Sequence, residues 1–152
     1  MHSEMEVYLA ADHNGFHLKN ELAEFLRGRG YEVVDLGPHE LDPLDDFPEA
    51  AADVAAAVLA SKAKYARGIL LCGSGQGVCM AANRYRGVRA SLGYDEASVR
   101  SARNDDDANV LCLPARGLSL RKAQSLTITW LETAFAGASR FKRRIKQMDK
   151  LG

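Results

Sequence analysis

The sequence predicts an α/β domain in which helices cover both faces of a parallel sheet of about five strands. Short apolar runs alternate along the chain with longer amphipathic stretches, which is the pattern of a doubly wound sheet. Residues 68–72 are apolar almost throughout, as expected of a strand covered on both faces. A chain of 152 residues fits one domain, 1–152, that buries about two-thirds of its surface without disulfide or metal support. We therefore expect a single three-layer α/β/α domain.

The first elements follow this alternation from the N-terminus. Residues 7–11 form an apolar run typical of a buried strand, and residues 16–26 carry apolar side chains at helical spacing. Gly30 marks the end of that helix, after which residues 31–36 return to a strand pattern. Residues 37–47 contain prolines and several acidic residues, so we expect a loop there.

The middle of the chain centres on a glycine-rich turn. Residues 48–64 are rich in alanine and predict a helix that leads into the strand at 68–72. A loop with three alternate glycines follows at 73–77, and a helix runs through residues 79–83.

The last elements complete the sheet and close the chain. Strands are expected at 88–92 and 109–113, with a helix at 96–102 between them. Two more helices follow at 120–135 and 139–150, and the second of these is basic.

Composition limits the classes of partner. Lys plus Arg and Asp plus Glu each number 20, and this zero net charge argues against nucleic acid or an anionic membrane. No apolar run approaches the roughly 20 residues of a membrane span, and the N-terminus has no signal-peptide pattern. The three cysteines form no CxxC pair, which argues against a disulfide framework or a zinc site. We expect a cytoplasmic protein without a metal.

Polar groups at the ends of three predicted strands mark the expected site. Ligands of open α/β sheets bind outside the carboxyl ends of the strands. Asp12 and His13 follow the first strand, residues 72–77 follow the third, and Arg116 lies beyond the fifth. We expect these groups to contribute to one binding site.

The glycine loop is suited to holding an anion. Three alternate glycines let successive backbone N–H groups point into one concavity at a helix N-terminus, where a phosphate or a reaction oxyanion fits. A tight turn without a ligand is the alternative. The loop lacks both the lysine of GxxxxGK[ST] and the third glycine spacing of GxGxxG. A dinucleotide-dependent oxidoreductase is therefore disfavoured.

Cys72 stands immediately before that loop. A helix N-terminus at this place would lower the pKa of a thiol from its free value of about 8.5. The alternative is a small buried apolar residue, which is the state we expect for Cys79 and Cys112.

Two charged pairs could serve binding or structure. Arg140 and Arg144 are four residues apart on one helix face, so they could converge on an anion or belong to a solvated basic face. Asp12 could orient His13, or both could cap the first helix.

Ordered motifs span most of the chain, namely ADHNGF at 11–16, DLG at 35–37, DFP at 46–48, GILLCGSG at 68–75 with AAN at 81–83, and DANVL at 107–111. Together they resemble the ribose-5-phosphate isomerase B group, which includes the galactose-6-phosphate isomerase subunits. The resemblance implies a Rossmann-like aldose–ketose isomerase of sugar phosphates that uses no cofactor. It also implies a homodimer or tetramer whose active site is shared between two subunits.

The resemblance implies roles for individual residues. Cys72 would be the base that moves a proton between C1 and C2, and Ser74 with the glycine loop would hold the enediolate oxygens. Some family members use a glutamate one residue past the loop, where this chain has Val78, which favours the cysteine. Arg116, Arg140 and Arg144 would bind the phosphate, at least one of them from the neighbouring subunit. The other expected substrate contacts are Asp12, His13, Gly73, Gly75, Gln76, Gly77 and Asp106.

Three positions depart from the family pattern. Asp105 and Asp106 stand where His-Asn is usual, and Phe141 replaces a histidine after Arg140. The family histidine is thought to donate a proton when the sugar ring opens. Asp105 could act as that catalytic acid only with a pKa well above about 3.9. Neutral drift at a non-essential position is the alternative.

The resemblance implies interconversion of ribose 5-phosphate and ribulose 5-phosphate as the default activity. One alternative is an isomerase of erythrulose 4-phosphate, galactose 6-phosphate or allose 6-phosphate, and another is a non-catalytic phospho-sugar-binding module. An aspartate at 105 favours four-carbon substrates, because a phosphate on O4 prevents closure of a furanose ring.

The closing helix predicts self-association. It is basic and amphipathic, and Phe135, Phe141, Ile145 and Met148 are available to be buried. We expect it to pack on a second copy in a two-fold dimer.

Overall fold

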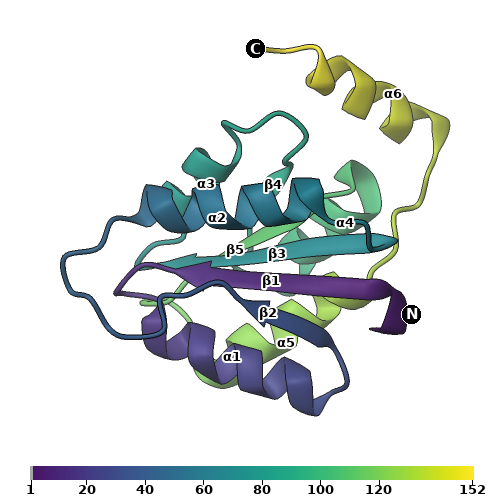
Figure 1. Ribbon diagram of the computed structural model, residues 1–152. Coiled ribbons are helices and arrows are strands. Elements are labelled where there is room, and N and C mark those ends of the chain that lie inside the picture. Colours follow the sequence, from purple (N-terminus) through teal and green to yellow (C-terminus); the bar gives the residue numbers. More distant parts are fainter. Residues whose placement is uncertain (1) are drawn as a thin grey trace.

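The computed structural model describes residues 2–152, and its five strands form one parallel sheet (Figure 1). The strands lie in the order β2-β1-β3-β5-β4. They are β1 (Met5–Ala11), β2 (Glu32–Asp35), β3 (Tyr65–Cys72), β4 (Ala90–Leu92) and β5 (Val110–Pro114). The expected fold class is confirmed.

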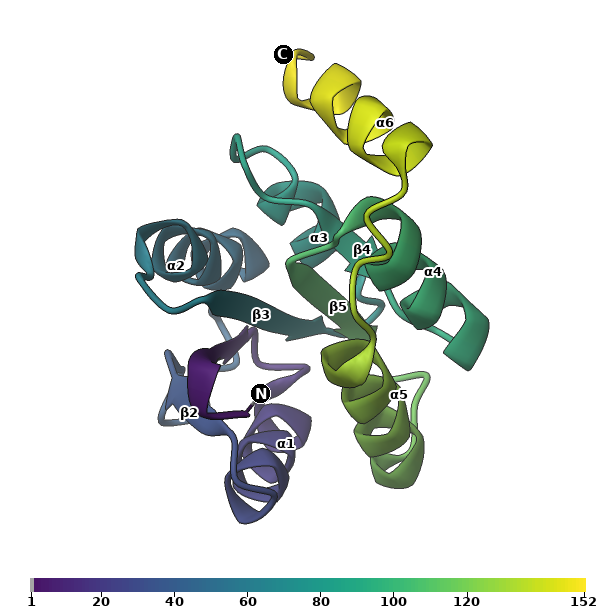
Figure 2. The ribbon, with the colours of Figure 1, turned by 90° about the vertical axis from the view of Figure 1, so that its right-hand side faces the viewer.

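Helices cover both faces of this sheet (Figure 2). The helices on one face are α1 (Phe16–Gly28), α4 (Glu96–Asp106) and α5 (Leu120–Glu132). Those on the other face are α2 (Phe47–Ala60) and α3 (Gln76–Ala82).

The continuous apolar pattern of β3 follows from this double cover. Ile69 and Leu71 belong to the apolar cluster under α1, α4 and α5, whereas Leu70 and Cys72 belong to the cluster under α2 and α3. Strand side chains alternate between faces, so a strand covered on both sides needs apolar residues at every position.

Several boundaries differ from those expected. β3 begins three residues early at Tyr65, because residues 65–67 pair in register with residues 5–7 of β1. α2 therefore ends at Ala60 instead of residue 64. α3 begins at Gln76, directly after Gly75 in the left-handed conformation, instead of at residue 79.

The connections after β1 and β3 leave the sheet on opposite faces. β1 leads into α1 on one face, and β3 leads into α3 on the other. Since β1 and β3 are neighbours, their carboxyl ends form the topological switch point of the sheet. The fold thus brings together Asp12–His13 and the glycine loop.

Helix α6 (Ser139–Asp149) stands apart from these layers (Figures 1 and 2). It contacts α4, and the Arg86 guanidinium donates to the backbone oxygen of its last residue, Asp149, and to that of Gly152. Phe141 is its one buried residue, whereas Met148 remains 43% exposed. Among residues 2–152, no helix is both long and apolar enough to cross a membrane.

Candidate active site

The carboxyl ends of β1 and β3 are joined by a close backbone contact. The Asp12 N–H donates to the Leu71 oxygen at 3.2 Å. Gly15, at the start of α1, lies so near β3 that a Cβ built on it would be 2.6 Å from Leu71 Cβ and 2.7 Å from the Leu71 oxygen. Only a glycine fits at this approach, and it fixes the Asp12–His13 segment beside Cys72.

Cys72 ends the central strand and is 5% exposed. Its carbonyl oxygen accepts from the Ala115 N–H at 2.9 Å, which ties it to the end of β5. The structure thus places the predicted base at the switch point, shielded from bulk water.

The glycine loop is shaped by close packing. Gly75 has a φ of 74°, and a Cβ there would lie 2.6 Å from Leu92 Cδ1. A Cβ on Gly77 would lie 2.8 Å from the ring of Phe47, which covers the loop from the start of α2. A left-handed residue before a helix turns neighbouring N–H groups toward one side, as an anion-binding loop requires.

Ser74 is exposed, and its hydroxyl oxygen accepts from the Gln76 N–H at 3.2 Å. The backbone N–H of Gln76 therefore already has a hydrogen-bond partner, and Ser74 helps to start α3. The Ser74 hydroxyl hydrogen remains available to a substrate oxygen.

Arg116 links the ends of β5, β3 and β1. Its N–H donates to the Gly73 oxygen at 3.0 Å, and its guanidinium lies 3.0 Å from where a Gly73 Cβ would stand. Its Nη2 donates to the side-chain oxygen of Asn14 at 3.3 Å. The absence of a side chain on Gly73 thus leaves space for the Arg116 guanidinium beside the loop. Asn14 positions that guanidinium, and no local pattern in the sequence indicates this role.

His13 is held by Asp45 instead of Asp12. Both the His13 N–H and the ring Nδ1 lie within hydrogen-bond distance of Asp45 Oδ1, at 2.8 and 2.9 Å. The hydrogen bond to Asp45 raises the pKa of His13, with a smaller contribution from the charge of Asp12. Asp12 is buried, and its Oδ1 accepts the N–H groups of Asn14 and Gly15. Asp12 therefore neither orients His13 nor caps α1, whose N-cap Gly15 has no side-chain cap hydrogen bond; it forms the turn that precedes the helix.

Four of the predicted site residues lie elsewhere in the same chain. Cys72 pairs with Pro114 and Gly68 pairs with Val110, so the end of α4, just before Val110, is at the opposite edge of the sheet. The four residue steps from Gly68 to Cys72 along β3 alone separate these two edges of the sheet by about 13 Å. Asp105 and Asp106 lie at this opposite edge, and Arg140 and Arg144 lie on α6. One chain therefore does not assemble the full predicted set.

The acidic pair and the arginines of α6 belong to one neighbourhood. Burial and the nearby Asp105 raise the pKa of Asp106, while the charges of Arg144 and Arg89 act in the opposite direction. The side-chain amide of Asn104 donates to Asp105 Oδ1 at 2.8 Å. Arg140 stacks on the Phe141 ring, with 4.4 Å between its Cζ and the ring centroid.

The other two cysteines are structural, as expected. Cys112 is fully buried in β5, and its burial raises the pKa of its thiol. Cys79 lies half-buried on α3, and a hydrogen bond with Cys112 lowers its pKa. Among residues 2–152, no group of three or more His, Cys, Asp or Glu side chains is arranged to hold a metal ion.

Known proteins are similar to this chain in sequence and in fold. The ribose/galactose isomerase family model matches residues 7–148. A probable ribose-5-phosphate isomerase B of Mycoplasma pneumoniae is 42% identical over 137 residues, which cover 90% of this chain and 89% of the relative.

Solved structures agree with this relationship. Ribose-5-phosphate isomerase B of Clostridium thermocellum superposes with a TM-score of 0.90 at 37% identity and covers 96% of each chain. Ribose-5-phosphate isomerase B of Mycoplasma genitalium with bound ribulose-5-phosphate gives a TM-score of 0.86 at 37% identity, covering 96% of this chain and 95% of the other. The chain is an aldose–ketose isomerase and belongs to the ribose/galactose isomerase family.

Proposed function

We propose that this protein interconverts ribose 5-phosphate and ribulose 5-phosphate, with the Cys72 thiolate as the base. The observation that carries the proposal is the position of Cys72, which is buried at the switch point between Asp12 and Arg116. The structural relative with bound ribulose-5-phosphate supports the five-carbon pair over four-carbon and six-carbon substrates. The free cysteines suit a reducing compartment, so we propose that the reaction takes place in the cytoplasm.

The chemistry requires a base and a stabilised enediolate. In the aldose-to-ketose direction, the Cys72 thiolate takes the proton from C2 and returns it to C1, while O2 loses a proton and O1 gains one. The C–H bond beside a carbonyl is weakly acidic, so donors must already face the oxygens where negative charge develops. In our proposal, those donors are the Ser74 hydroxyl and the backbone N–H groups of the glycine loop other than that of Gln76, which Ser74 already accepts.

The remaining groups of this edge orient the substrate. Arg116 stands above Gly73, where its charge can hold the phosphate or an enediolate oxygen. His13, held by Asp45, points its other ring nitrogen away from that carboxylate and contacts the sugar. Fixing the phosphate and the reacting carbons together lowers the entropic part of the barrier.

We further propose that the complete site contains residues from two copies of the chain. Asp105, Asp106, Arg140 and Arg144 lie beyond the reach of Cys72 in their own chain. A two-fold dimer would bring this group from each copy to the glycine loop of the other and form two equivalent sites. The separate position of α6 supports an intersubunit contact.

Replacement of Cys72 tests the assignment. Cys72→Ala should abolish both isomerisation and the exchange of the substrate carbon-bound hydrogen with solvent, as followed by NMR in deuterated water, while the variant still binds ribose 5-phosphate. Cys79→Ala is the matched control and should stay active, because the Cys79 thiol on α3 donates to the Ala90 carbonyl oxygen of β4. Full isomerase activity in Cys72→Ala would disprove the base. Binding of ribose 5-phosphate without hydrogen exchange in the unaltered protein would disprove the proposed substrate pair.

A further inference from the structure

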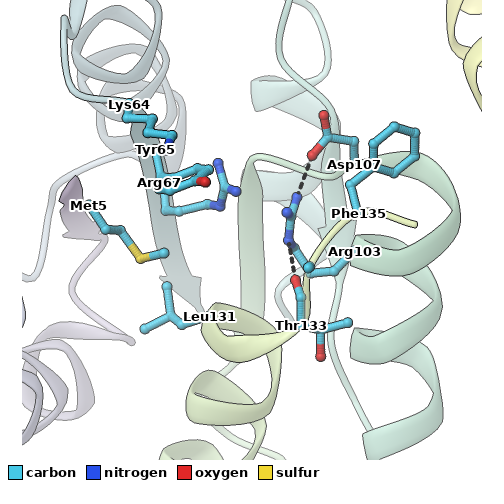
Figure 3. Close-up of a pocket in the computed structure, with 10 residues that line it drawn as sticks. Met5, Lys64, Tyr65, Arg67, Arg103, Asp107, Leu131, Thr133 and Phe135 are labelled. Carbon is cyan, nitrogen blue, oxygen red and sulfur yellow. Dashed lines mark hydrogen bonds and ion pairs between the residues drawn. The ribbon is translucent and has the colours of Figure 1, made fainter. Parts of the chain in front are cut away.

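A cavity lies at the edge of the sheet opposite Cys72 (Figure 3). Its volume is about 400 Å³, within the range of small-molecule sites. Apolar walls come from Met5, Leu131 and Phe135, and cationic groups come from Arg67 and Arg103. The cavity is therefore built from the starts of β1 and β3 and the ends of α4 and α5.

Arg67 is a buried cation in this cavity. It is 9% exposed, and its Nε has no hydrogen-bond partner among the described residues. Its Nη1 donates to the carbonyl oxygen of Ala66 at 3.1 Å, and its guanidinium lies 5.6 Å from the centroid of the Tyr65 ring. Burial, together with the charge of Arg103, lowers the pKa of Arg67 to about 10. A buried cation needs a counter-charge or hydrogen-bond acceptors.

The neighbouring acid is already committed elsewhere. Asp107 Oδ1 accepts from Arg103 Nη1 at 2.8 Å, and its Oδ2 lies 3.5 Å from Arg89 Nη2. Lys64, at the rim, pairs with Glu4 at 3.6 Å. Within the described part of the chain, no ion pair is formed by Arg67. The cavity thus carries a net positive charge beside apolar walls.

We propose that this cavity binds a compact organic anion, a phosphate monoester or a carboxylate attached to a small apolar body. The oxyanion would accept from the Arg67 guanidinium, and the apolar body would lie against Met5, Leu131 and Phe135. A guanidinium presents paired N–H donors that match the oxygens of either anion. The cavity is separate from the Cys72 site, because it opens at the amino ends of the strands.

The test uses phenyl phosphate and benzoate, each titrated separately. Trp130 is the single tryptophan, and Arg103 lies 5.9 Å from its ring, so its fluorescence can report occupancy. At least one probe should bind saturably, and Arg67→Met should weaken that binding by about 10-fold or more. Arg100→Met is the matched control and should bind unchanged, because Arg100 is exposed on α4 and pairs with Glu96.

Further measurements separate this cavity from the isomerase site and from a purely structural role of Arg67. Arg116→Met should leave the binding constant unchanged. The probe at about 100 times its Kd should raise the Tm of the unaltered protein by about 5–10 °C but not that of Arg67→Met. Without a probe, the Tm of Arg67→Met should equal or exceed that of the unaltered protein.

The outcomes decide the proposal. Absence of saturable binding by both probes, or binding lost in Arg116→Met but kept in Arg67→Met, would overturn it. If Arg67→Met does not fold, crystals of the unaltered protein soaked in tungstate replace the variant. An anomalous peak beside the Arg67 guanidinium would support the site, and an empty cavity would refute it.

Discussion

Gly15 offers a sharp test of how the strand ends hold the site, because an added methyl group has no free space there. In Gly15→Ala the new Cβ would meet Leu71 Cβ at 2.6 Å, its carbonyl oxygen at 2.7 Å and its carbonyl carbon at 2.8 Å. Two of these atoms are backbone of the central strand, so α1 must move instead. Overpacking of this kind costs about 3 kcal/mol, which lowers the Tm of a 152-residue domain by about 6–12 °C.

The same displacement should impair catalysis. Moving the start of α1 shifts Asp12 and His13 relative to Cys72, and a misplacement of about 1 Å at an active site can cost on the order of 10²-fold in rate. Gly28→Ala is the matched control in the same helix, because no atom beyond its chain neighbours and the adjacent helix backbone lies within 4 Å of its Cβ position. It should stabilise the protein by about 0.5–1 kcal/mol and leave kcat/KM unchanged.

Thermal unfolding and kcat/KM for ribose 5-phosphate, measured on both variants, check these values. Equal Tm and kcat/KM in Gly15→Ala and the unaltered protein would refute the close-contact reasoning. Equal losses in Gly15→Ala and Gly28→Ala would show that any alanine in α1 is harmful.

Two further predictions concern charges. Asp45→Asn should lower the pKa of His13 in an NMR titration, because the hydrogen bond to Asp45 raises that pKa above 6.5. The resulting loss of Tm should be larger at about pH 5.5 than at about pH 8.5. A raised histidine pKa stabilises the fold below the pKa of the unfolded state, and this contribution disappears as the pH rises through the folded pKa. An equal loss of Tm at both pH values would contradict this prediction. Asp105→His should increase kcat/KM for ring-forming ribose 5-phosphate more than for erythrulose 4-phosphate, because a histidine titrating near neutral pH can protonate the ring oxygen. A strong preference of the unaltered protein for ribose 5-phosphate that Asp105→His leaves unchanged would refute this assignment.

The sequence predicted the layers well because local spacing controls them. The apolar run at β3 and the helical spacing of α1 are properties of neighbouring residues, and both elements contain all the residues expected of them. Boundaries were less accurate where pairing with a distant strand decides them. Tyr65 lies in β3 because it pairs with Met5, which no local pattern around residue 65 could indicate.

The residues of the candidate site at the strand ends could be predicted from the sequence, but the side chains that hold them in place could not. Cys72, the glycine loop and Arg116 were found because strand ends and glycines are visible in the sequence. The Asp45 carboxylate that holds His13 is 32 residues away in an acidic loop, so its pairing depends on the folded path of that loop. The position of Asp105 at the opposite edge of the sheet likewise depends on the direction of α4.

The shared active site is the central claim, and mixed dimers test it most directly. One chain would carry Cys72→Ala and the other Arg140→Met with Arg144→Met, so that each homodimer is inactive. When equal amounts are unfolded together and refolded, half of the dimers should be mixed, and each mixed dimer should contain one intact site and one doubly altered site. The account predicts recovery of about one-quarter of the activity of the unaltered protein. No recovery in dimers shown by mass spectrometry to be mixed would contradict it, because the cysteine and the arginines would then act within one chain.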